Sequence, residues 1–513
     1  MSKTVDFKGK PFHFIGIGGI GMSALAYILA KRNLPVSGSD LRSTHITDRL
    51  ESVGAHIFQS QDAANLDFFQ TSRELAAAGV GAPANGHGSN GNGTNGRNAI
   101  ASNGTIAPSH AREMPQIICS TAIGTENEEY RAALKHGYPI LHRSDLLAAL
   151  IEDYQGIAVS GTHGKTTTSS AIGYMLVEAG LDPTIIVGGE INGIGGNARL
   201  GQGKYLVAEA DESDGSLTKF SPAIGIITNI ELDHPDHYRN LDEVVATFKT
   251  FVRQCQVTIG CIDCDTVREE IAPQISYSLD PQKNADYTVT EVEYRSDGTI
   301  AKVWERGVLL GELKLQLLGE HNLSNALAAV ATGRQAGLEF EAIAKGLVSF
   351  TGAKRRFEHR GEVNGITFVD DYAHHPSELR ATLAAARLRL QARESNGESN
   401  GSPIGRVVAV FQPHRFSRTL TFLQEFAESF DDADMVVLTD IYSAGEVDLG
   451  QVSGGHLARS LSEHHDRVFY QPSLQEVKDF LQKNLQPGDL ALFLGAGNLN
   501  QVIPQILTFY AEQ

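Results

Sequence analysis

The stretch GIAVSGTHGKTTTSSAIGYMLVEAG, residues 156–180, decides the fold of the middle of this chain. A short β-rich run, 156–161, leads into a loop of glycine, threonine and histidine, and a helical stretch begins near Thr166. Strand, glycine loop and helix in this order are typical of a P-loop, whose backbone N–H groups surround phosphate oxygens. The loop departs from the full pattern G-x-x-x-x-G-K-[ST], because Val159 occupies the outer glycine position and the glycine stands at Gly161 instead.

Two side chains of this loop carry the chemistry that the motif predicts. We expect the Lys165 ammonium to reach the terminal phosphates of ATP and the Thr166 hydroxyl to reach Mg²⁺. The other predicted ATP-binding positions of the loop are Gly161, Thr162, His163, Gly164 and Thr167. A chance match between a strand and a helix is the less favoured alternative.

Short β-rich runs alternate with helical stretches along most of the chain. The runs are FHFIGIGG (12–19), QIICSTA (116–122), GIAVSG (156–161), YLVAEAD (205–211), AIGIITNI (223–230), RVVAVFQP (406–413), DMVVLTD (434–440) and DLALFLGAG (489–497). Such alternation predicts the α/β class, with parallel sheets covered by helices. At 513 residues the chain is too long for one core, so we expect three domains, 1–150, 151–353 and 354–513. The outer two are predicted to be Rossmann-like, and the central one to hold a mostly parallel sheet of the P-loop ATPase type.

The first domain opens with the glycine-rich stretch GIGGIG, residues 16–21, between a strand and a helix. Gly16, Gly18 and Gly21 satisfy G-x-G-x-x-G, and Asp40 follows 19 residues after Gly21. In this fingerprint a tight glycine turn lets a diphosphate sit on a helix N-terminus. The glycines recognise a diphosphate only, so NAD, FAD and a UDP-sugar all remain compatible, as does a close-packed turn without a ligand.

Acidic and histidine side chains follow two later strands. The segment AEADESD (208–214) ends one strand and TNIELDHPDHY (228–238) ends the next. They contain Glu209, Asp211, Glu212, Asp214, Asp233, His234, Asp236 and His237. Carboxylates suit a hard cation, and open α/β sheets bind their ligands at the carboxyl ends of strands. We therefore expect a metal site here, with a solvated acidic turn as the alternative.

Composition and charge narrow the class of protein further. The net charge of −18 argues against nucleic acid, because phosphate contacts need clustered Lys and Arg. No apolar run approaches the ~18 residues of a membrane span, and MSKTVDFKGK at the N-terminus has no signal-peptide core. We interpret the four cysteines as plain thiols of a cytoplasmic protein. An Asn/Gly-rich insert at about 82–112 and a polar stretch at 392–406 are interpreted as flexible surface loops.

Eight segments, taken in order, resemble the Mur ligase family of ATP-dependent amide-forming enzymes over nearly the whole chain. They are HFIGIGGIGMSALA (13–26), GTHGKTTT (161–168), EADESD (209–214), TNIELDH (228–234), GEHNLSNALAA (319–329), GAKRRFE (352–358), DDYAHHPSE (370–378) and FQPHRFSRT (411–419). The first and the seventh are similar to the alanine-adding branch, whose sister ligases share the P-loop but not these two. The insert at about 82–112 has no place in the family's usual pattern.

The resemblance implies a role for each of these segments. The first domain would hold the UDP part of a UDP-sugar through Gly16, Gly18, Gly19, Gly21, Met22 and Asp40. Mg²⁺ would be bound by Thr166, Glu209 and His234, and ATP would be contacted from outside the loop by Asn322, Asn325, Arg356 and Asp371. The amino-acid side would be formed by His374, His375, Arg415 and Arg418, and the catalytic set would be Lys165, Thr166, Glu209, His234, His374 and Arg415. Lys249 lies where some sister ligases carry a carbamylated lysine, but the alanine-adding branch is not expected to need one.

The implied reaction is the ATP-dependent joining of L-alanine to the lactyl carboxylate of UDP-N-acetylmuramate, the first peptide step of peptidoglycan precursor synthesis. It would pass through an acyl phosphate, because a free carboxylate has a poor leaving group. Three alternatives stay open: a ligase of the same family that adds another amino acid or a peptide, an NAD-linked oxidoreductase, and a non-catalytic ATP-binding protein. A monomer or homodimer is expected, with no nucleic-acid or membrane partner.

Overall fold

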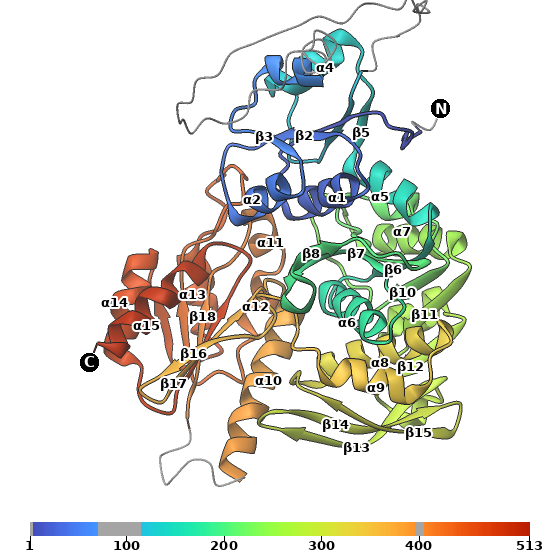
Figure 1. The fold of residues 1–513 in the computed structure, drawn as a ribbon. Helices are drawn as coiled ribbons and strands as arrows, with labels where there is room; N and C mark the ends of the chain where they lie inside the picture. Colours follow the sequence, from blue (N-terminus) through green and yellow to red (C-terminus); the bar gives the residue numbers. More distant parts are fainter. Residues whose placement is uncertain (1–3, 70–113, 396–404, 513) are drawn as a thin grey trace, which may run out of the picture. The chain divides into compact units, whose positions relative to one another are not determined.

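The computed structural model describes residues 4–69, 114–395 and 405–512. The chain divides into two compact units, Met1–Leu146 and Leu147–Gln513, of which the first holds one sheet and the second holds two (Figure 1). The predicted insert at about 82–112 lies outside the described residues, as do residues 396–404 of the second polar stretch. The domain limits remain a prediction, and each predicted domain encloses one of the three sheets.

The first unit contains five parallel strands in the order β3-β2-β1-β4-β5. The strands are β1 (Phe12–Ile15), β2 (Val36–Ser39), β3 (His56–Phe58), β4 (Gln116–Cys119) and β5 (Ile140–His142). The helices are α1 (Ile20–Lys31), α2 (His45–Ser52), α4 (Glu128–His136) and α5 (Arg143–Glu152), the last of which runs on into the second unit. This strand order is that of a Rossmann-like sheet, and the chain passes from β1 through the glycine stretch into α1.

The central sheet has ten strands in the order β15-β14-β13-β12-β11-β10-β6-β9-β7-β8, of which β13 to β7 run parallel. They are β6 (Gln155–Ser160), β7 (Thr184–Ile191), β8 (Gly196–Arg199), β9 (Tyr205–Glu209), β10 (Ile224–Ile227), β11 (Val257–Cys261), β12 (Ile275–Ser278), β13 (Tyr287–Arg295), β14 (Gly298–Glu305) and β15 (Val308–Leu315). All four residues of β10 are buried. A strand that is covered on both faces reads as a continuous apolar run, which is why β10 was visible in the sequence.

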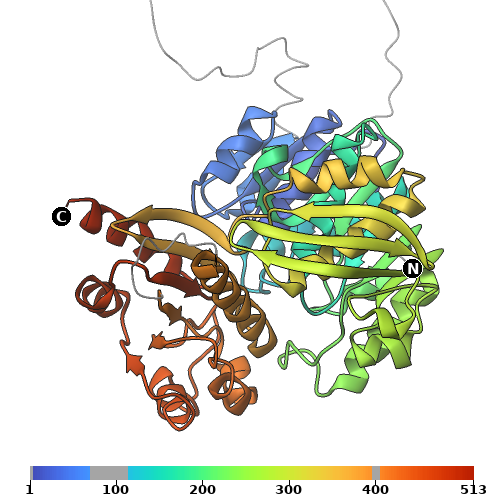
Figure 2. The ribbon, with the colours of Figure 1, turned by 90° about the horizontal axis from the view of Figure 1, so that it is seen from below.

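Helices α6 (Lys165–Glu178), α7 (Leu241–Gln254), α8 (Glu320–Gln335) and α9 (Phe340–Val348) accompany this sheet. Met175 of α6 and Leu327 of α8 are fully buried in one apolar core with Val207 of the sheet. The face of α7 that carries Phe248 and Phe251 is buried as well. Figure 2 shows α8 and α9, in yellow, running alongside the antiparallel strands β13–β15.

The third sheet has six strands in the order β16-β17-β21-β18-β19-β20, parallel except for the pair β16–β17. They are β16 (Glu358–Val363), β17 (Ile366–Asp371), β18 (Val407–Phe411), β19 (Met435–Leu438), β20 (Val468–Tyr470) and β21 (Leu490–Leu494). Its helices are α10 (Pro376–Ser395), α11 (Phe416–Thr421), α12 (Leu423–Ala427), α13 (Gly454–Leu461), α14 (Leu474–Asn484) and α15 (Val502–Ala511). Two separate apolar cores, one around Phe426 and one around Ile506, hold these helices to the sheet.

The structure confirms the α/β class, and each of the eight predicted β-rich runs contains a strand. The antiparallel strands β8, β14, β15 and β16 were not predicted. β16 and β15 have no run of consecutive buried residues, so they lack the apolar signature of the inner strands. Within the described residues no helix has both the length and the apolar character to cross a bilayer. The four cysteines are free, with Cys119 and Cys261 buried and the other two half-buried.

A buried carboxylate joins four segments of the first unit. Glu129 of α4 has no solvent exposure, and its Oε1 accepts from Asn65 Nδ2 (2.7 Å) and lies 3.2 Å from His13 Nε2. Its Oε2 accepts from Ser39 Oγ at 2.5 Å. β1, β2, the short helical turn Ala63–Asp67 and α4 are therefore joined by one side chain.

We predict that Glu129→Ala lowers the stability of the first unit by about 3 kcal/mol, because it leaves several buried polar groups without an acceptor. Hydrogen exchange of the β1 and β4 amides in increasing urea measures this loss locally. Glu128→Ala is the matched control, since Glu128 is the exposed neighbour on the same helix, and it should change stability by less than about 0.5 kcal/mol. Equal losses for the two variants would contradict the role given to the buried network.

Candidate active site

The order of three neighbouring strands creates the candidate active site in the second unit. β6 lies between β10 and β9, and all three run parallel. Their carboxyl ends therefore meet at one edge of the sheet. The phosphate loop follows β6, Glu209 ends β9, and the segment 228–238 follows β10. Open α/β sheets bind their ligands at this edge.

The phosphate loop adopts a backbone that requires glycine at two positions. Gly161 has a φ of 134° and Gly164 a φ of 83°, values that side chains disfavour. A Cβ at Gly161 would lie 2.0 Å from Thr228 Oγ1, and one at Gly164 would lie 2.6 Å from Asn325 Oδ1. Gly164 precedes α6 as a cap without a side-chain hydrogen bond. The loop leads directly into the N-terminus of α6, whose first backbone N–H groups have no partner within the helix and therefore suit an anion.

The Lys165 ammonium is held within this loop. Its Nζ donates to the carbonyl oxygens of Gly161 (2.7 Å) and Thr162 (3.0 Å) and to Glu212 Oε1 (2.9 Å). Burial lowers the pKa of Lys165, but three nearby carboxylates, Glu212 foremost, outweigh burial and raise that pKa above its ordinary value. The lysine is therefore cationic and fixed at the carboxyl end of β6.

Several carboxyl groups surround Lys165 at this edge of the sheet. Glu209, Asp211 and Glu212 all raise the pKa of Lys165, so one cation faces three carboxyl groups at this edge. Burial and Asp211 raise the pKa of Glu212 to about 7 against the opposing effect of Lys165. Ligand atoms of Asp211, Glu212 and His234 lie within 4.8 Å of one another. Burial lowers the pKa of His234, which keeps its imidazole neutral, and the group as a whole suits a divalent cation.

Two of the predicted metal ligands are in direct contact. Thr166 Oγ1 donates to Glu209 Oε1 (3.1 Å), and the Gly188 N–H donates to Glu209 Oε2 (2.8 Å). A Cβ at Gly188 would lie 2.7 Å from that oxygen, so β7 can approach the carboxylate only because residue 188 is glycine. The third predicted ligand, His234, is placed by the structure nearer to Glu212, at 3.9 Å between Nε2 and Oε1.

The asparagines predicted to contact adenine lie at the start of α8. Both Asn322 and Asn325 are buried. Asn325 Oδ1 accepts from Thr168 Oγ1 (3.0 Å), and Asn325 Nδ2 donates to Asn322 Oδ1 (3.5 Å). Because Asn325 also faces Gly164, the structure brings this pair against the phosphate loop.

Arg356 precedes β16, and Asp371 is the last residue of β17. Asp371 Oδ2 accepts from the Phe357 N–H (2.6 Å), and Oδ1 accepts from the Ala373 N–H (2.8 Å). Burial raises the pKa of Asp371 to about 6, although Arg356 opposes this shift. Arg356 Nη1 lies 3.8 Å from Glu378 Oε1 of α10. These contacts place both predicted ATP-closing residues close to the start of α10.

A buried ion pair links the third sheet to the segment that follows β10. Arg418 Nε donates to Asp233 Oδ1 (2.9 Å) and Nη2 to Oδ2 (3.3 Å), and both side chains are nearly inaccessible. Burial raises the pKa of Asp233, but the Arg418 guanidinium and neighbouring histidines hold it well below its ordinary value. Arg415 Nη1 makes a second, exposed pair with Asp236 Oδ2 (2.7 Å). The predicted amino-acid arginines thus both face the metal-site segment.

His374 and His375 lie between β17 and α10. His374 Nδ1 is 2.9 Å from the Tyr372 carbonyl oxygen and 3.3 Å from Glu378 Oε2. Burial lowers the pKa of His374 to about 3, so its ring is neutral near pH 7. Burial also lowers the pKa of His375, to about 4.

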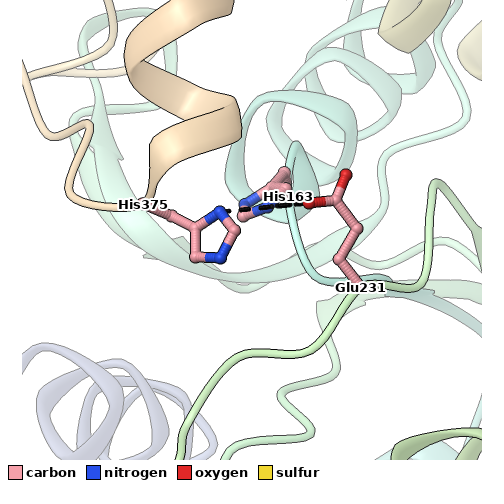
Figure 3. Close-up of side chains that lie close together, drawn as sticks. All are labelled: His163, Glu231 and His375. Atoms are coloured by element: carbon pink, nitrogen blue, oxygen red, sulfur yellow. Dashed lines mark ion pairs between the residues drawn. The ribbon is translucent and has the colours of Figure 1, made fainter. Parts of the chain in front are cut away.

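His163 of the phosphate loop contacts the third-sheet side of the site. Its Nε2 is 3.5 Å from Glu231 Oε2, its Nδ1 is 3.3 Å from Glu378 Oε1, and its ring centre is 4.6 Å from that of His375. Figure 3 shows the two rings and the Glu231 carboxylate directed toward one another. Burial lowers the pKa of His163, but Glu231 and Glu378 more than reverse this and raise it to about 10.

In the first unit, Asp40 braces the glycine stretch. Its Oδ2 accepts from the Gly18 N–H (2.9 Å), and a Cβ at Gly18 would lie 2.7 Å from the same oxygen. Gly19 caps α1 without a side-chain hydrogen bond. A Cβ at Gly21 would lie 3.4 Å from Arg143 Nη1, so a guanidinium stands beside the helix start.

The remaining two predicted UDP-sugar residues have structural positions of their own. Gly16 has a φ of 78° and forms the turn that leaves β1. Met22 is buried in α1 with 3% of its surface exposed, so it supports the turn from below.

Three family models match the chain over almost its whole length. The Mur ligase family catalytic domain matches residues 11–84 and 71–155, the Mur ligase middle domain matches 159–333, and the Mur ligase glutamate ligase domain matches 355–497. The chain belongs to the Mur ligase family. The first and third matched regions each contain a whole sheet, and the middle one, which begins within β6, contains the rest of the ten-stranded sheet.

Individual Mur ligases match the chain from end to end. It is 62% identical, over 99% of both chains, to the UDP-N-acetylmuramate–L-alanine ligase of Gloeothece citriformis. It is 63% identical, over 100% of this chain and 99% of the relative, to the enzyme of the same name from Nostoc punctiforme. The crystal structure of the UDP-N-acetylmuramate-alanine ligase of Thermotoga maritima covers 98% of this chain and 99% of its own at 25% identity, with a TM-score of 0.75. A murein peptide ligase of Psychrobacter arcticus, at 20% identity and a TM-score of 0.64, shares the fold.

Several polar residues of this Mur ligase site were not predicted. Glu231, Ser377 and Glu378 lie inside segments that carried the family resemblance, but the sequence did not show that Glu231 and Glu378 contact His163 or that Ser377 donates to Glu231. Glu212 was assigned to an acidic cluster and proves to be the ion-pair partner of Lys165. The side chain left aside, Lys249, pairs with Glu270 at the surface at 2.6 Å. Pairings of this kind join residues far apart in the sequence and have no local signal.

We predict that Asp233→Asn lowers stability at pH 7 by about 3–5 kcal/mol, because Arg418 is left as an uncompensated buried charge. Since the pKa of Asp233 lies below its ordinary value of 3.8, its stabilisation is complete above that pH and is lost only as the pH falls below it. Urea unfolding followed by circular dichroism at pH 7 and pH 3 measures both effects. Asp236→Asn, which breaks the exposed pair with Arg415, should cost less than about 1 kcal/mol. If Asp233→Asn lowered stability no more than Asp236→Asn does, the stabilising role given to the buried Asp233–Arg418 pair would be wrong.

Proposed function

We propose that this Mur ligase joins L-alanine to the lactyl carboxylate of UDP-N-acetylmuramate at the expense of ATP, the first peptide step of peptidoglycan precursor synthesis. The observation that carries the proposal is a phosphate loop whose Lys165 and Thr166 face Glu209, in a chain 62% identical along its length to a relative named for this reaction. The expected setting is the cytoplasm, with the protein acting as a monomer or homodimer.

The chemistry explains why a phosphate loop serves an amide-forming enzyme. A carboxylate resists attack by an amine because its oxygen is a poor leaving group. Transfer of the γ-phosphoryl group of ATP to a lactyl oxygen breaks the bond to ADP and gives an acyl phosphate. The amine of alanine then attacks the acyl carbon, and inorganic phosphate leaves with the lactyl oxygen. No side-chain nucleophile is needed.

Lys165 has the position that phosphoryl transfer requires. Its ammonium lies within the loop that ends β6, is fixed by two loop carbonyls and stays protonated because of the surrounding carboxylates. A fixed cation there neutralises charge that develops on the transferred group without reorganising during the reaction. Arg356, Asp371, Asn322 and Asn325 are the further ATP contacts that we propose.

The residues of this edge fit a magnesium ion. The Thr166 hydroxyl and the Glu209 carboxylate already face each other, and a site rich in carboxyl oxygens suits a divalent cation. His234 would add a neutral imidazole from the neighbouring strand end. When bound, the ion would neutralise charge on the phosphate oxygens. Thr166, Glu209 and His234 are the ligands that we propose.

The third sheet supplies the side of the site that we assign to the amino acid. His374 is neutral and held by Tyr372 and Glu378, so it can contact the incoming amine without repelling it. Arg415, which is half-buried beside Asp236 and Glu446, is the cation that we assign to the alanine carboxylate. Contacts that exclude water at this side protect an acyl phosphate from hydrolysis.

The first unit supplies the features that a UDP-sugar needs. The uncapped start of α1 and the turn at Gly18 suit a diphosphate, and Arg143 beside Gly21 adds a positive charge. The Asp40 carboxylate accepts a hydrogen bond from the Gly18 N–H. We therefore propose that Asp40 stabilises the turn as well as contacting the nucleotide.

We predict that Lys165→Ala and Glu209→Ala each lower turnover by about 1,000-fold or more, because both act on the charge of the transferred phosphoryl group. UDP-N-acetylmuramate affinity, measured by calorimetry, should stay within about twofold, since the glycine stretch belongs to the other unit. Lys249→Ala, at a surface pair with Glu270, is the matched control and should leave turnover unchanged. Loss of sugar affinity together with turnover would refute this division of labour.

A second prediction addresses the acyl phosphate directly. UDP-N-acetylmuramate labelled with ¹⁸O in its lactyl carboxylate should pass one labelled oxygen to the inorganic phosphate released in the presence of L-alanine. If water attacked the γ-phosphate instead, a reaction in ¹⁸O-water with unlabelled sugar would place the label there. Mass analysis of the phosphate from the two paired reactions distinguishes the routes, and unlabelled phosphate from productive turnover of the labelled sugar would exclude the proposed mechanism.

A further inference from the structure

Two imidazoles and one carboxylate converge beside the phosphate loop, apart from the proposed magnesium ligands. His163 comes from the loop after β6, Glu231 from the segment after β10, and His375 from the residue before α10 (Figure 3). Glu231 Oε2 lies 3.5 Å from His163 Nε2 and 3.9 Å from His375 Nδ1. One ligand atom of each residue lies within 4.8 Å of those of the other two.

These separations are close to those around a zinc ion. With metal–ligand bonds of about 2.1 Å and tetrahedral angles, ligand atoms stand about 3.4 Å apart. The His163–Glu231 distance already matches this value, and the His375–Glu231 distance needs a contraction of a few tenths of an ångström. Rotation about the side-chain bonds of Glu231, which is 40% exposed, supplies such a change without moving the backbone.

The partners of His163 and Glu231 also match the arrangement that surrounds metal ligands in proteins. His163 Nδ1, the nitrogen that would point away from the ion, lies 3.3 Å from Glu378 Oε1. Ser377 Oγ donates to Glu231 Oε2 at 2.6 Å. Metal-ligating histidines usually present their second nitrogen to a carboxylate, and ligating carboxylates accept further hydrogen bonds. Glu378 and His163 therefore already form the carboxylate–histidine pair that supports a metal ligand.

The two histidines are buried and incompletely satisfied. The His375 side chain is 5% exposed and that of His163 is 13% exposed. Among the described residues, His163 Nε2 and His375 Nε2 are buried and have no hydrogen-bond partner, whereas His375 Nδ1, the nitrogen nearer Glu231, accepts from the Ser377 N–H at 3.3 Å. His163 Nε2 thus faces Glu231 without a hydrogen bond. Because a buried polar atom without a partner is unfavourable, binding of a ligand at this nitrogen would stabilise the site.

We propose that His163, Glu231 and His375 form a binding site for Zn²⁺, with Glu378 and Ser377 as its outer partners. Two nitrogens and one oxygen are the donor set of a zinc site with an open fourth position, whereas Mg²⁺ prefers oxygen ligands throughout. The ion would join the phosphate loop to the start of α10. If the proposed function also holds, occupancy withdraws a loop side chain from ATP and slows turnover.

A proton is the competitor of the metal at this cluster. His163 between Glu231 and Glu378 can instead be an imidazolium that bridges two carboxylates, with no metal involved. The two states make opposite predictions, because a zinc site needs His375 as a ligand while a protonated His163 needs only the carboxylates. Zinc binding therefore decides between them independently of activity.

The test measures zinc binding to the full, chelator-treated chain by competition with a chromophoric chelator. We expect one tight equivalent that Mg²⁺ does not displace. His163→Gln and His375→Gln should weaken binding by more than the roughly 10- to 100-fold that loss of an outer partner causes, and Glu378→Gln and Ser377→Ala should fall within that range. Thermal unfolding of each variant checks that the fold is intact.

His234→Gln and His414→Gln are the matched controls. His234 belongs to the cluster with Asp211 and Glu212, and His414 follows β18 outside the proposed zinc ligands, so both variants should retain the zinc equivalent. Absence of tight binding, or binding lost with His234→Gln but kept with His375→Gln, would overturn the proposal. Cobalt added to the unsubstituted chain gives a test without any variant: intense visible bands of a four-coordinate ion support the site, and the absence of such bands contradicts it.

Discussion

The ammonium of Lys165 is the charge around which the candidate site is organised. It binds two carbonyls of its own loop and the buried Glu212, and it lies close enough to two further carboxylates to raise its pKa. Without this cation, the carboxyl end of β9 would place three carboxylates together, one of them buried, which is costly in free energy. With it, a residual excess of negative charge remains, and that excess is what a divalent cation can neutralise. The same charge balance around Lys165 therefore stabilises the fold at this edge and favours binding of a divalent cation.

A second ion pair extends this arrangement to the third sheet. Arg418 and Asp233 are both nearly inaccessible, so neither charge is stable there without the other. Asp233 immediately precedes His234, and Arg418 lies one turn beyond Arg415 in α11. The pair therefore fixes the segment after β10 and the segment after β18 at the same time. Its position explains how residues from two sheets within the second unit come to face one phosphate loop.

Some site residues could be predicted because their chemistry is tied to a local pattern. Gly161 and Gly164 mark a loop between a strand and a helix, and Thr166 follows the lysine at a fixed spacing. Glu209 ends an apolar run, so its place at the strand's carboxyl end was visible as well. The contacts of Glu231, Glu378 and Asp40 could not be predicted, because their partners belong to other elements. Asp40 shows the difference: the spacing predicted a nucleotide contact, and the structure shows its carboxylate accepting the Gly18 N–H.

The sequence by itself determined the class of each sheet, the phosphate loop, the glycine stretch and the family resemblance, because each depends on residues close together in the chain. Periodic apolar runs and glycines at required positive φ are local properties. Only the tertiary structure decided which side chains meet. The order β10-β6-β9 brings Glu209 and the segment 228–238 to either side of Lys165, and the packing of α10 brings Glu378 and His375 to His163. Such pairings follow from strand order and burial, which are properties of the whole unit and leave no mark at fixed spacing in the sequence.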